Sequence, residues 1–461
     1  MLRRKGLCIV MAFVMASLVA AAGCGSKAQD NTTGGKDNVE PAAETSGSVQ
    51  PDAGEEDTDS GKSEGADLTM LINADNALGG IQAVCDLAEK KMGIHVEIET
   101  RVGGSDGDNI VKTRLASGEM ADICVYNSGA TFAALNPEEY FIDLTDEAWM
   151  GNLDDNYLQS VTVKDKVYGI PSASMNCGVI LYNKDIYDKY KLSVPKTWDE
   201  FMANCETIKK GGETALIGSL ATPWTGQVIQ LGDFYNVNAQ DPAFAQEFQK
   251  GSAKYADTPA ALRSFEKLEE TIPYYNEDFL ATTYDDACDK LANAEGAHWP
   301  ILSYAIQNIY ELYGEEAANK IGAFAVPGDS ADNNGITVWI PESFYGNKNS
   351  ENIEAIKQFF EFYITPEALD AYCSALLPDG PFCEKGYELP DNVYDMVKQE
   401  QSYIEAGKWG TAMEFQTSVK GADLPAICQE LISGQTTAKK AAQKYDDDCL
   451  KAAVQMGLDW K

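Results

Sequence analysis

The sequence predicts an α/β protein with mainly parallel sheets, because short apolar runs that suit buried strands alternate with stretches whose apolar residues recur at helical spacing. The first apolar run covers 68–73. A helical stretch follows and ends at Gly93, and residues 95–100 then alternate like a second strand. Strand, helix and strand fit into about 33 residues, which is the size of a right-handed βαβ unit.

The alternation continues along the chain. Thr197 and Glu200 have the spacing of a capping box, in which the threonine side chain caps a helix and the glutamate reaches back. Pro259 and Pro366 each follow a threonine and predict first helical turns. Apolar residues at helical spacing predict another helix over 352–363. Further strand-like runs lie at 121–126, 215–220, 321–326 and 336–340.

The first 24 residues predict a processing signal. A basic start is followed by an apolar stretch over 7–22 and by small residues before Cys24, which is the secretory pattern; the stretch is short for a membrane-spanning helix. The run Ala-Ala-Gly-Cys resembles a bacterial lipobox. We therefore expect a signal peptide over 1–24 and a lipid on Cys24 that anchors the chain to the outer face of the cell membrane.

The next segment, 25–67, differs sharply in composition. It contains 11 acidic residues and 3 lysines, with no aromatic residue and no Leu, Ile or Met. Such a segment has too little apolar surface to form a packed core. The composition predicts a disordered acidic tether between the membrane and the folded part of the chain.

The charge balance restricts the partners. The 461 residues carry 36 basic and 72 acidic side chains, for a net charge of −36. A surface this negative repels phosphate backbones and anionic lipid headgroups. We therefore expect no nucleic-acid partner.

Few side chains suit a metal or redox site. His95 and His298 are the only histidines, and none of the 11 cysteines lies in a C-x-x-C pair, so we expect no metal and no cofactor. Nine cysteines lie beyond residue 67. Cys373 and Cys383 could form a disulfide, whereas an odd, scattered set is also typical of buried unpaired thiols.

Several stretches in a fixed order carry a resemblance to a known family. They are V-Y-G-I-P at 167–171, L-Y-N-K-D at 181–185 and V-P-K-T-W-D-E at 194–200. A helix with a T-P-E-A motif within 347–375, and the run I-S-G-Q-T at 432–436, follow. On these residues the chain resembles the maltose-binding-type (family 1) extracellular solute-binding proteins of bacterial ABC importers.

The resemblance implies a two-lobed, type II periplasmic-binding-protein-like fold with crossover hinge strands. The ligand would lie in the cleft between the lobes, which close around it by hinge motion. The implied function is that of a monomer that captures a mono- or oligosaccharide and delivers it to ABC permease subunits. The expected boundaries are 68–173 and 333–370 for lobe 1, 176–326 and 371–461 for lobe 2, and 172–177 and 326–335 for the crossovers.

Sugar chemistry selects candidate binding residues. Hydroxyl groups need hydrogen-bond partners such as Asp, Glu, Asn and Gln, whereas the apolar C–H face of a sugar stacks on an aromatic ring. Trp224 follows the strand-like run 215–220, at the carboxyl end where α/β sheets bind ligands, and is the strongest candidate. Gln227 and Asp233 lie near it and are weaker candidates.

Other candidates follow further strands. Asp75 and Asn76 come after the first strand, at a position where the resemblance implies contacts with sugar hydroxyls; the pair equally suits a turn with Asx hydrogen bonds. Tyr126 and Asn127 close the third strand, where the family often has an aromatic platform. Asn176 lies at the first crossover and aligns with a carboxylate that contacts the ligand in the family.

The resemblance also points to three aromatic residues late in the chain. Tyr304 stands near the position of a family tryptophan, and Trp299 would add a second platform. Trp409 precedes the C-terminal helices and would cover the site. Trp339 and His298 are interpreted instead as a core residue and a hydrogen-bonded loop residue.

Two alternatives to sugar capture stay open. A glycosidase needs two carboxylates about 5 to 10 Å apart around a sugar, and 72 acidic residues do not exclude such a pair. The chain has no G-x-S-x-G, phosphate-loop or H-E-x-x-H motif, so we expect no enzymatic activity. The other alternative is a solute-binding protein for a ligand that is not a sugar.

Overall fold

The computed structural model describes residues 65–74, 76, 78–102 and 104–460. The described residues all belong to one compact unit within Gly61–Lys461. The expected signal peptide, the lipid on Cys24 and nearly all of the expected tether lie outside the described residues. The first strand begins at Ala66, so the expected tether end at residue 67 is slightly too late.

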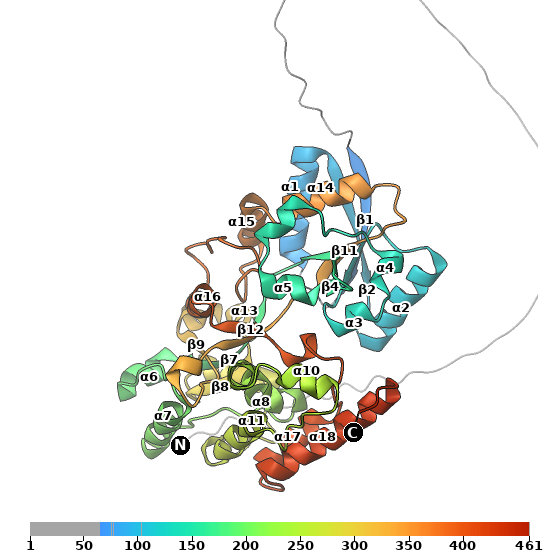
Figure 1. Cartoon of the computed structure of the whole chain (residues 1–461). Helices are drawn as coiled ribbons and strands as arrows, with labels where there is room; N and C mark the ends of the chain where they lie inside the picture. The colour runs from blue at the N-terminus through green and yellow to red at the C-terminus, as the bar shows by residue number, and fades with distance from the viewer. Residues whose placement is uncertain (1–64, 75, 77, 103, 461) are drawn as a thin grey trace, which may run out of the picture. The chain divides into compact units, whose positions relative to one another are not determined.

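A five-stranded sheet forms the first half of the fold (Figure 1). Its strand order is β2-β1-β3-β11-β6. β1 and β2 pair in parallel with Leu68 opposite Val96, and α1 (Leu78–Met92) joins them, so the predicted βαβ unit is confirmed. The strand bounds are β1 Ala66–Asn73, β2 Ile94–Arg101, β3 Ile123–Tyr126, β6 Gly169–Pro171 and β11 Ser343–Gly346.

A second sheet forms the other half. Its order is β12-β10-β7-β8, and β9 pairs with β7 beyond the end of β10. The long strand β7 is therefore the centre of this sheet. The strand bounds are β7 Asn176–Asn183, β8 His298–Leu302, β9 Ile321–Ala325, β10 Ile336–Trp339 and β12 Trp409–Thr411, and a separate hairpin pairs β4 (Thr162–Val163) with β5 (Lys166–Val167).

Both sheets are mixed, which corrects the prediction of mainly parallel sheets. In the first sheet β11 is antiparallel to both of its neighbours, β3 and β6. In the second, β7 is antiparallel to β8, β9 and β10. The remaining strands of each sheet run in one direction. Because each reversed strand lies in the interior of its sheet, most hydrogen-bonded pairs are nevertheless antiparallel.

Helices cover both sheets (Figure 1). α15 (Pro366–Ala375) packs along α1, and α16 (Asp395–Glu405) packs on β9. The other α-helices are α2 (Gly104–Ser117), α3 (Ala130–Ala133), α4 (Pro137–Tyr140), α5 (Asp155–Ser160), α6 (Lys184–Tyr190), α7 (Trp198–Lys210), α8 (Val228–Gly232), α9 (Phe234–Gln240), α10 (Phe244–Gln249), α11 (Pro259–Glu270), α12 (Tyr284–Ala292), α13 (Ala305–Asn319), α14 (Ile353–Tyr363), α17 (Leu424–Ile432) and α18 (Ala438–Gln455). Short 3-10 helices are η1 (Ala148–Asn152), η2 (Pro223–Gln227), η3 (Ile272–Tyr274), η4 (Ala331–Asn333) and η5 (Met413–Phe415).

The predicted helix starts agree with the structure. At the start of α7 the Thr197 hydroxyl accepts a hydrogen bond from the backbone N–H of Glu200 at 3.3 Å. The Glu200 carboxylate accepts from the backbone N–H of Lys196 at 2.7 Å, one residue before the position that a capping box predicts. Pro259 and Pro366 occupy the first turns of α11 and α15.

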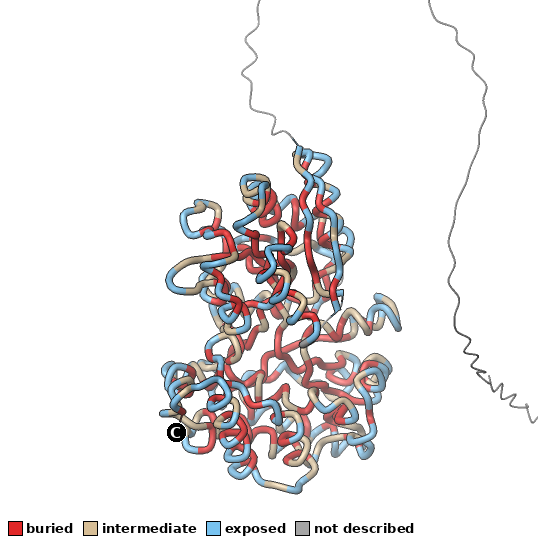
Figure 2. The backbone as a smooth tube through the Cα atoms, turned by 90° about the vertical axis from the view of Figure 1, so that its right-hand side faces the viewer, coloured by how far each residue is buried: buried red, intermediate tan, exposed pale blue. Residues whose placement is uncertain are grey.

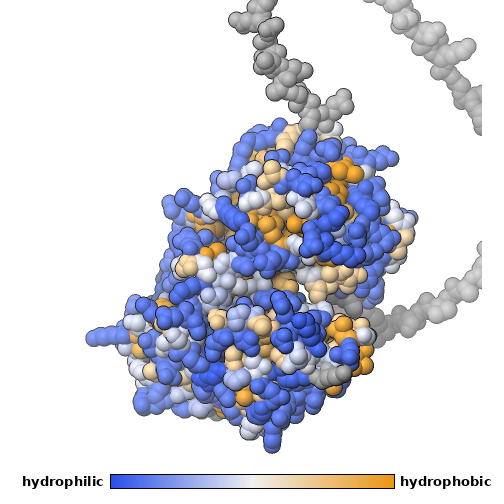
Figure 3. All heavy atoms as spheres, in the orientation of Figure 1, coloured by the Kyte–Doolittle hydropathy of each residue, from blue (hydrophilic) through white to orange (hydrophobic). Residues whose placement is uncertain are grey.

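Buried residues lie in the interior of the fold (Figure 2), and two apolar clusters that include the strands make up its core. One cluster contains the first sheet and continues onto one face of β7 through Cys177 and Val179; the other contains the opposite face, with Ile180 and Tyr182. This alternation is the period of two that a strand buried on both faces requires. The face of the molecule in Figure 3 is mostly hydrophilic, in keeping with the strong net charge.

Three connections join the two sheets. Residues 172–175 lead from β6 to β7, residues 340–342 lead from β10 to β11, and a third connection follows α15. The return at 340–342 differs from the expected crossover at 326–335, because β10 still belongs to the second sheet. Residues 371–375 are part of α15, which packs on α1, so the expected start of the last lobe 2 segment at 371 is too early.

These connections are hydrogen-bonded to one another. The backbone N–H of Ser172 donates to the carbonyl of Glu342 at 3.0 Å. On the other side, the backbone N–H of Met175 donates to the carbonyl of Pro381 at 2.7 Å, and the Ser174 hydroxyl donates to the Asp379 carboxylate at 2.8 Å. The three connections therefore form one strip between the sheets, which we call the hinge strip.

The nine cysteines of the described chain are buried and unpaired. Cys373 and Cys383 do not form the disulfide considered from the sequence, and burial raises the pKa of the Cys373 thiol to about 11. The thiols thus act as small core residues. Within the described ranges, no helix is both long enough and apolar enough to cross a membrane.

Candidate functional site

A polar cluster lies where β1, β2 and β3 end and β11 begins. It consists of Asn76, Arg101, Tyr126 and Glu342. The Asn76 side-chain amide donates to the Glu342 carboxylate at 2.7 Å, and the Arg101 guanidinium lies 3.8 Å from the other oxygen of that carboxylate. The Arg101 guanidinium carbon also lies 5.7 Å from the ring centroid of Tyr126. Because β11 runs in reverse, its amino end meets the carboxyl ends of its neighbours, and the cluster follows from that topology.

The charged pair in this cluster is largely removed from solvent. The side chain of Arg101 is 3% exposed and that of Glu342 is 14% exposed. Tyr126 is fully buried, which corrects the expectation of an aromatic platform at this position, and burial, followed by the negative charge of Asp108, raises its pKa. The cluster therefore offers fixed hydrogen-bonding groups whose opposite charges compensate each other at short range.

An aromatic cluster lies at the corresponding end of the second sheet. Trp224, Tyr284 and Tyr304 come from η2, from the start of α12 and from the residue before α13. The ring centroid of Trp224 lies 6.0 Å from that of Tyr284 and 6.2 Å from that of Tyr304, and the two tyrosine centroids are 6.1 Å apart. The ring planes differ by only 27° to 35°. Trp224 and Tyr304 are both half-buried.

Local sequence holds these rings in place. Thr283 and Asp286 form a capping box that fixes the start of α12, so Tyr284 begins the helix. The backbone N–H of Tyr284 donates to the Thr222 hydroxyl at 3.1 Å, just before η2, and the Tyr284 hydroxyl donates to the Asn308 side chain at 2.8 Å. These bonds tie together the segments that carry the rings.

Trp299 supports the aromatic cluster from inside and corrects the expectation of an extra platform. It is 1% exposed, its indole N–H donates to the Ser219 hydroxyl at 3.2 Å, and its ring centroid lies 5.2 Å from that of Tyr284. A ring this buried has no face for a ligand. Its contribution is to fix the position of Tyr284.

The hinge strip borders both clusters. Glu342 belongs to its second connection and Asp379 to its third. Gly380, which follows Asp379, lies against the hydroxyl of Ser303, the residue before Tyr304. Burial raises the pKa of Tyr304 to about 12, so its hydroxyl is a donor at neutral pH. Burial also raises the pKa of Asp379 itself to about 6.

Asn176 and Trp339 pair where the strip enters the second sheet. The Asn176 side-chain carbonyl is buried and has no hydrogen-bond partner among the described residues. The Trp339 indole N–H donates to Glu414 at 2.9 Å, so this tryptophan is half-buried with a polar partner rather than sealed in the core as expected. Glu400 is 1% exposed, and burial followed by the charge of Asp379 raises its pKa well above the ordinary value.

Four other expected residues have different outcomes. Asp75 lies outside the described residues, so its expected role stays a prediction, and Asn127, which follows Tyr126, is exposed. Asp233 forms a buried ion pair with Lys267 at 2.5 Å, so it holds the core together instead of facing a ligand. His298 is a fully buried strand residue of β8, which corrects its interpretation as a loop residue.

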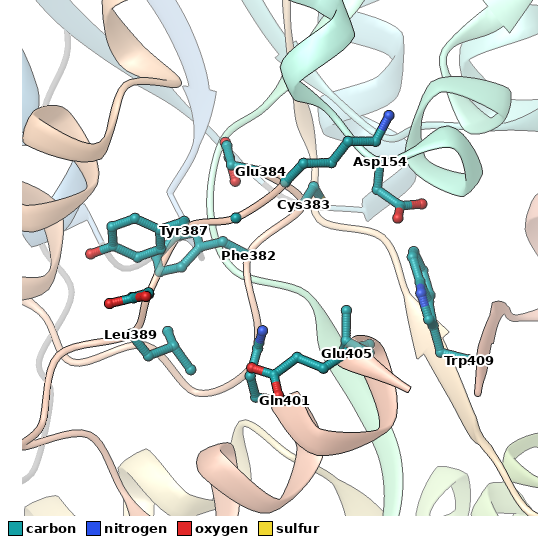
Figure 4. A pocket seen from close by; sticks show the side chains of 13 residues that line it. Asp154, Phe382, Cys383, Glu384, Tyr387, Leu389, Gln401, Glu405 and Trp409 are labelled. Atoms are coloured by element: carbon teal, nitrogen blue, oxygen red, sulfur yellow. The ribbon is translucent and has the colours of Figure 1, made fainter. Parts of the chain in front are cut away.

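Trp409 also lies away from the aromatic cluster. It pairs with Ile336, at the opposite end of β10 from Trp339. Figure 4 shows its indole extending from β12 toward Asp154, in a pocket of about 360 Å³ that also includes Glu405. The expectation that Trp409 covers the site beside Trp224 is therefore not supported by its position.

Sequence reasoning missed Arg101, Glu342, Tyr284 and Asp379. The capping box at 283–286 is a local signal that could have drawn attention to Tyr284. Arg101 and Glu342 meet only because β11 inserts beside β3. Together the two clusters supply an amide, a compensated pair of charges and a group of aromatic rings. The described residues contain no group of three or more His, Cys, Asp or Glu side chains arranged to hold a metal ion.

Comparison with known proteins gives consistent matches. The sequence pattern of the bacterial extracellular solute-binding protein family matches residues 73–370. The multiple sugar-binding protein of Streptococcus mutans serotype c is 24% identical over 72% of this chain and 80% of its own length. The melibiose/raffinose/stachyose-binding protein MelE of Bacillus subtilis is 29% identical over 76% of this chain and 82% of its own length. The apo form of RafE from Streptococcus pneumoniae superposes with a TM-score of 0.71 at 17% identity, covering 85% of this chain and 99% of that one.

Proposed function

The chain belongs to the bacterial extracellular solute-binding protein family, and from that premise we propose that it captures a mono- or oligosaccharide outside the cell for an ABC importer. The ligand would bind between the polar cluster and the aromatic cluster. Lobe closure would then be favoured only by the better contacts that the ligand makes in the closed arrangement. The permease subunits would receive the loaded monomer.

The observation that carries this proposal is the pairing of two kinds of surface along the hinge strip. Trp224 and Tyr304 offer two half-buried rings, tilted by 34° to each other, that suit the C–H faces of a sugar. Asn76 and Glu342 offer the amide and carboxylate that suit its hydroxyl groups. Two relatives carry names that describe sugar binding, which supports the same ligand class.

Lipid anchoring and the absence of catalytic activity are parts of the same proposal. A lipid on Cys24, followed by the acidic tether, would hold the domain near the permease outside the membrane. We propose binding without hydrolysis, because the charge of Glu342 is compensated by Arg101 and Asp379 accepts a hydrogen bond from Ser174. Sugar fragments released during incubation of the pure protein with oligosaccharides would favour the glycosidase instead.

Calorimetric titration with raffinose and stachyose tests the proposal directly. Trp224→Ala should weaken binding by about 30-fold or more, which corresponds to about 2 kcal/mol for a central aromatic contact. Trp149→Ala is the matched control, because Trp149 is half-buried in η1 and belongs to neither cluster. Equal affinities for the two variants would reject the site. If the wild-type protein bound none of the sugars in a broad panel, the ligand class would be rejected.

A further inference from the structure

A second cavity, of about 300 Å³, lies beside β12 and shares no residue with either cluster. Its walls come from α5 on one side, and from α9, β12 and the residue after η5 on the other. The side chains that matter for a ligand are Asn156, Gln159, Tyr235, Asn238, Trp409 and Gln416. The volume is at the lower end of the range for small-molecule sites, about 300 to 1,000 Å³, which is room for about one sugar ring.

The lining of this cavity carries no charge. Its residues are amides, one threonine, three aromatic residues, glycine and alanine. The neighbouring pocket of Figure 4 is lined by Asp154, Glu384, Lys385, Glu388 and Glu405. Trp409 separates the two spaces, since it lines both. In a chain with 72 acidic residues, a wholly neutral polar wall selects against charged ligands and in favour of a neutral one.

The amides in this wall have unused hydrogen-bonding capacity. The side chains of Asn156, Gln159 and Asn238 make no hydrogen bond to any other described residue. Gln416 uses its amide N–H group on the Thr411 carbonyl at 3.0 Å, which leaves its side-chain oxygen to accept. Each free amide offers two donors and an acceptor, the pattern that pairs with vicinal hydroxyl groups.

The cavity also joins residues of the two halves of the fold. Asn156 and Gln159 lie on α5, whose last residue, Ser160, accepts a hydrogen bond from the backbone N–H of Gly129 just after β3. Asn238 and Gln416 belong to segments packed on the second sheet. A ligand held by both sets would therefore connect the same two halves as a ligand in the main site.

We propose that this cavity is a second carbohydrate site, which takes one neutral sugar unit against the half-buried ring of Tyr235 and hydrogen-bonds its hydroxyl groups through Asn156, Gln159 and Asn238, while the largely buried Trp409 forms the back of the cavity. The inference deepens the proposed function and rests on it for the ligand class. Neutral amides with aromatic side chains suit a polyhydroxylated ring with an apolar face. Charged metabolites would lack a counter-charge in this wall.

NMR signals of the tryptophan indole N–H groups report on each site separately. The protein would be labelled with ¹⁵N-tryptophan, and the signals of Trp224 and Trp409 would be assigned with the variants Trp224→Phe and Trp409→Phe. Raffinose and stachyose are then titrated separately into the wild type and into the double variant Asn156→Ala/Asn238→Ala. In the wild type, we expect both indole signals to shift and reach saturation as sugar is added. In the double variant, the sugar affinity obtained from the Trp409 signal should fall by at least 10-fold, and the affinity obtained from the Trp224 signal should stay the same. Gln401→Ala, in the charged pocket on the other side of Trp409, is the matched control and should leave both responses unchanged.

The outcomes separate the two proposals. A shift at Trp224 with a silent Trp409 overturns the second site and leaves the proposed function intact. Equal shifts at Trp409 in the wild type and the double variant also overturn it, because the signal would then report a movement transmitted from elsewhere. If neither indole responds to either sugar, the second site and the proposed ligand class both fail. A response at Trp409 alone supports the second site and rejects the main site.

Discussion

Replacing His298 by glutamine should reduce the loss of folding stability that occurs between pH 7 and pH 4. His298 is fully buried, its Nδ1 lies 2.8 Å from the Ala215 carbonyl, and its Nε2 lies 2.8 Å from the Tyr187 hydroxyl. The carbonyl can only accept, so Nδ1 carries the proton and the Tyr187 hydroxyl donates to Nε2. A second ring proton would force the Tyr187 hydroxyl to give up its donated hydrogen bond and would place a charge in the core, and this burial lowers the pKa of His298 to about 4.

The size and sign of the effect follow from this pKa. The unfolded chain binds a proton at this histidine below a pKa near 6.5, whereas the folded chain does so only below about 4. Protonation therefore favours the unfolded state between these values. The stability contributed by neutral His298 is complete above pH 6.5 and falls as the pH decreases, by about 3 kcal/mol between pH 7 and pH 4 at 1.36 kcal/mol per unit.

Urea unfolding at a series of pH values measures this contribution. The free energy of unfolding of the wild type minus that of His298→Gln should decrease by about 3 kcal/mol between pH 7 and pH 4. Burial raises the pKa of Asp379 and Glu384, which acts in the opposite direction, but these acids are present in both proteins and cancel in the difference. His95→Gln, at an exposed histidine, is the control and should follow the wild-type profile. A difference between wild type and His298→Gln that stays constant across this range would refute the reasoning.

Two further predictions concern the core. Asp233→Asn should lower the free energy of unfolding by about 3 to 5 kcal/mol, because it leaves the buried ammonium of Lys267 without its charge partner. Asp233→Leu combined with Lys267→Met should lower the free energy of unfolding by less than the sum of the two single changes. Additive losses, measured by chemical denaturation, would contradict the pairing. The nine buried cysteines of the described chain should react with a chromogenic disulfide reagent only after unfolding, since burial raises the pKa of their thiols. Rapid reaction in native buffer would show that some of these thiols are accessible.

Local signals predicted the elements well. The opening βαβ unit and the starts of α7, α11 and α15 all depend on residues close in sequence, such as Thr197 and Pro366. Trp224 was expected to follow a strand over 215–220, where the structure has only isolated bridges at Leu216, and Tyr304 was expected from the family resemblance; the structure nevertheless brings their rings together. Whether they contact a ligand remains a prediction.

Pairing between distant segments explains what sequence reasoning missed. A strand pattern gives no direction, so β11 and β7 could not be predicted as reversed strands. The same limit hid Arg101 and Glu342, which are brought together by the insertion of β11. It also misplaced Trp409, since its position depends on the register of β12 against β10.

The interior position of β11 also constrains the order in which the protein can assemble. β6 pairs only with β11 within the first sheet, and β11 lies between β3 and β6. During synthesis, residues 66–171 emerge long before residues 343–346, and until then the edge of β3 has no neighbour and β6 has no place in a sheet. The first sheet therefore cannot be completed until a strand far downstream in the sequence has been synthesised. Because this pairing is non-local, we expect completion of the sheet to be a late and slow step in folding.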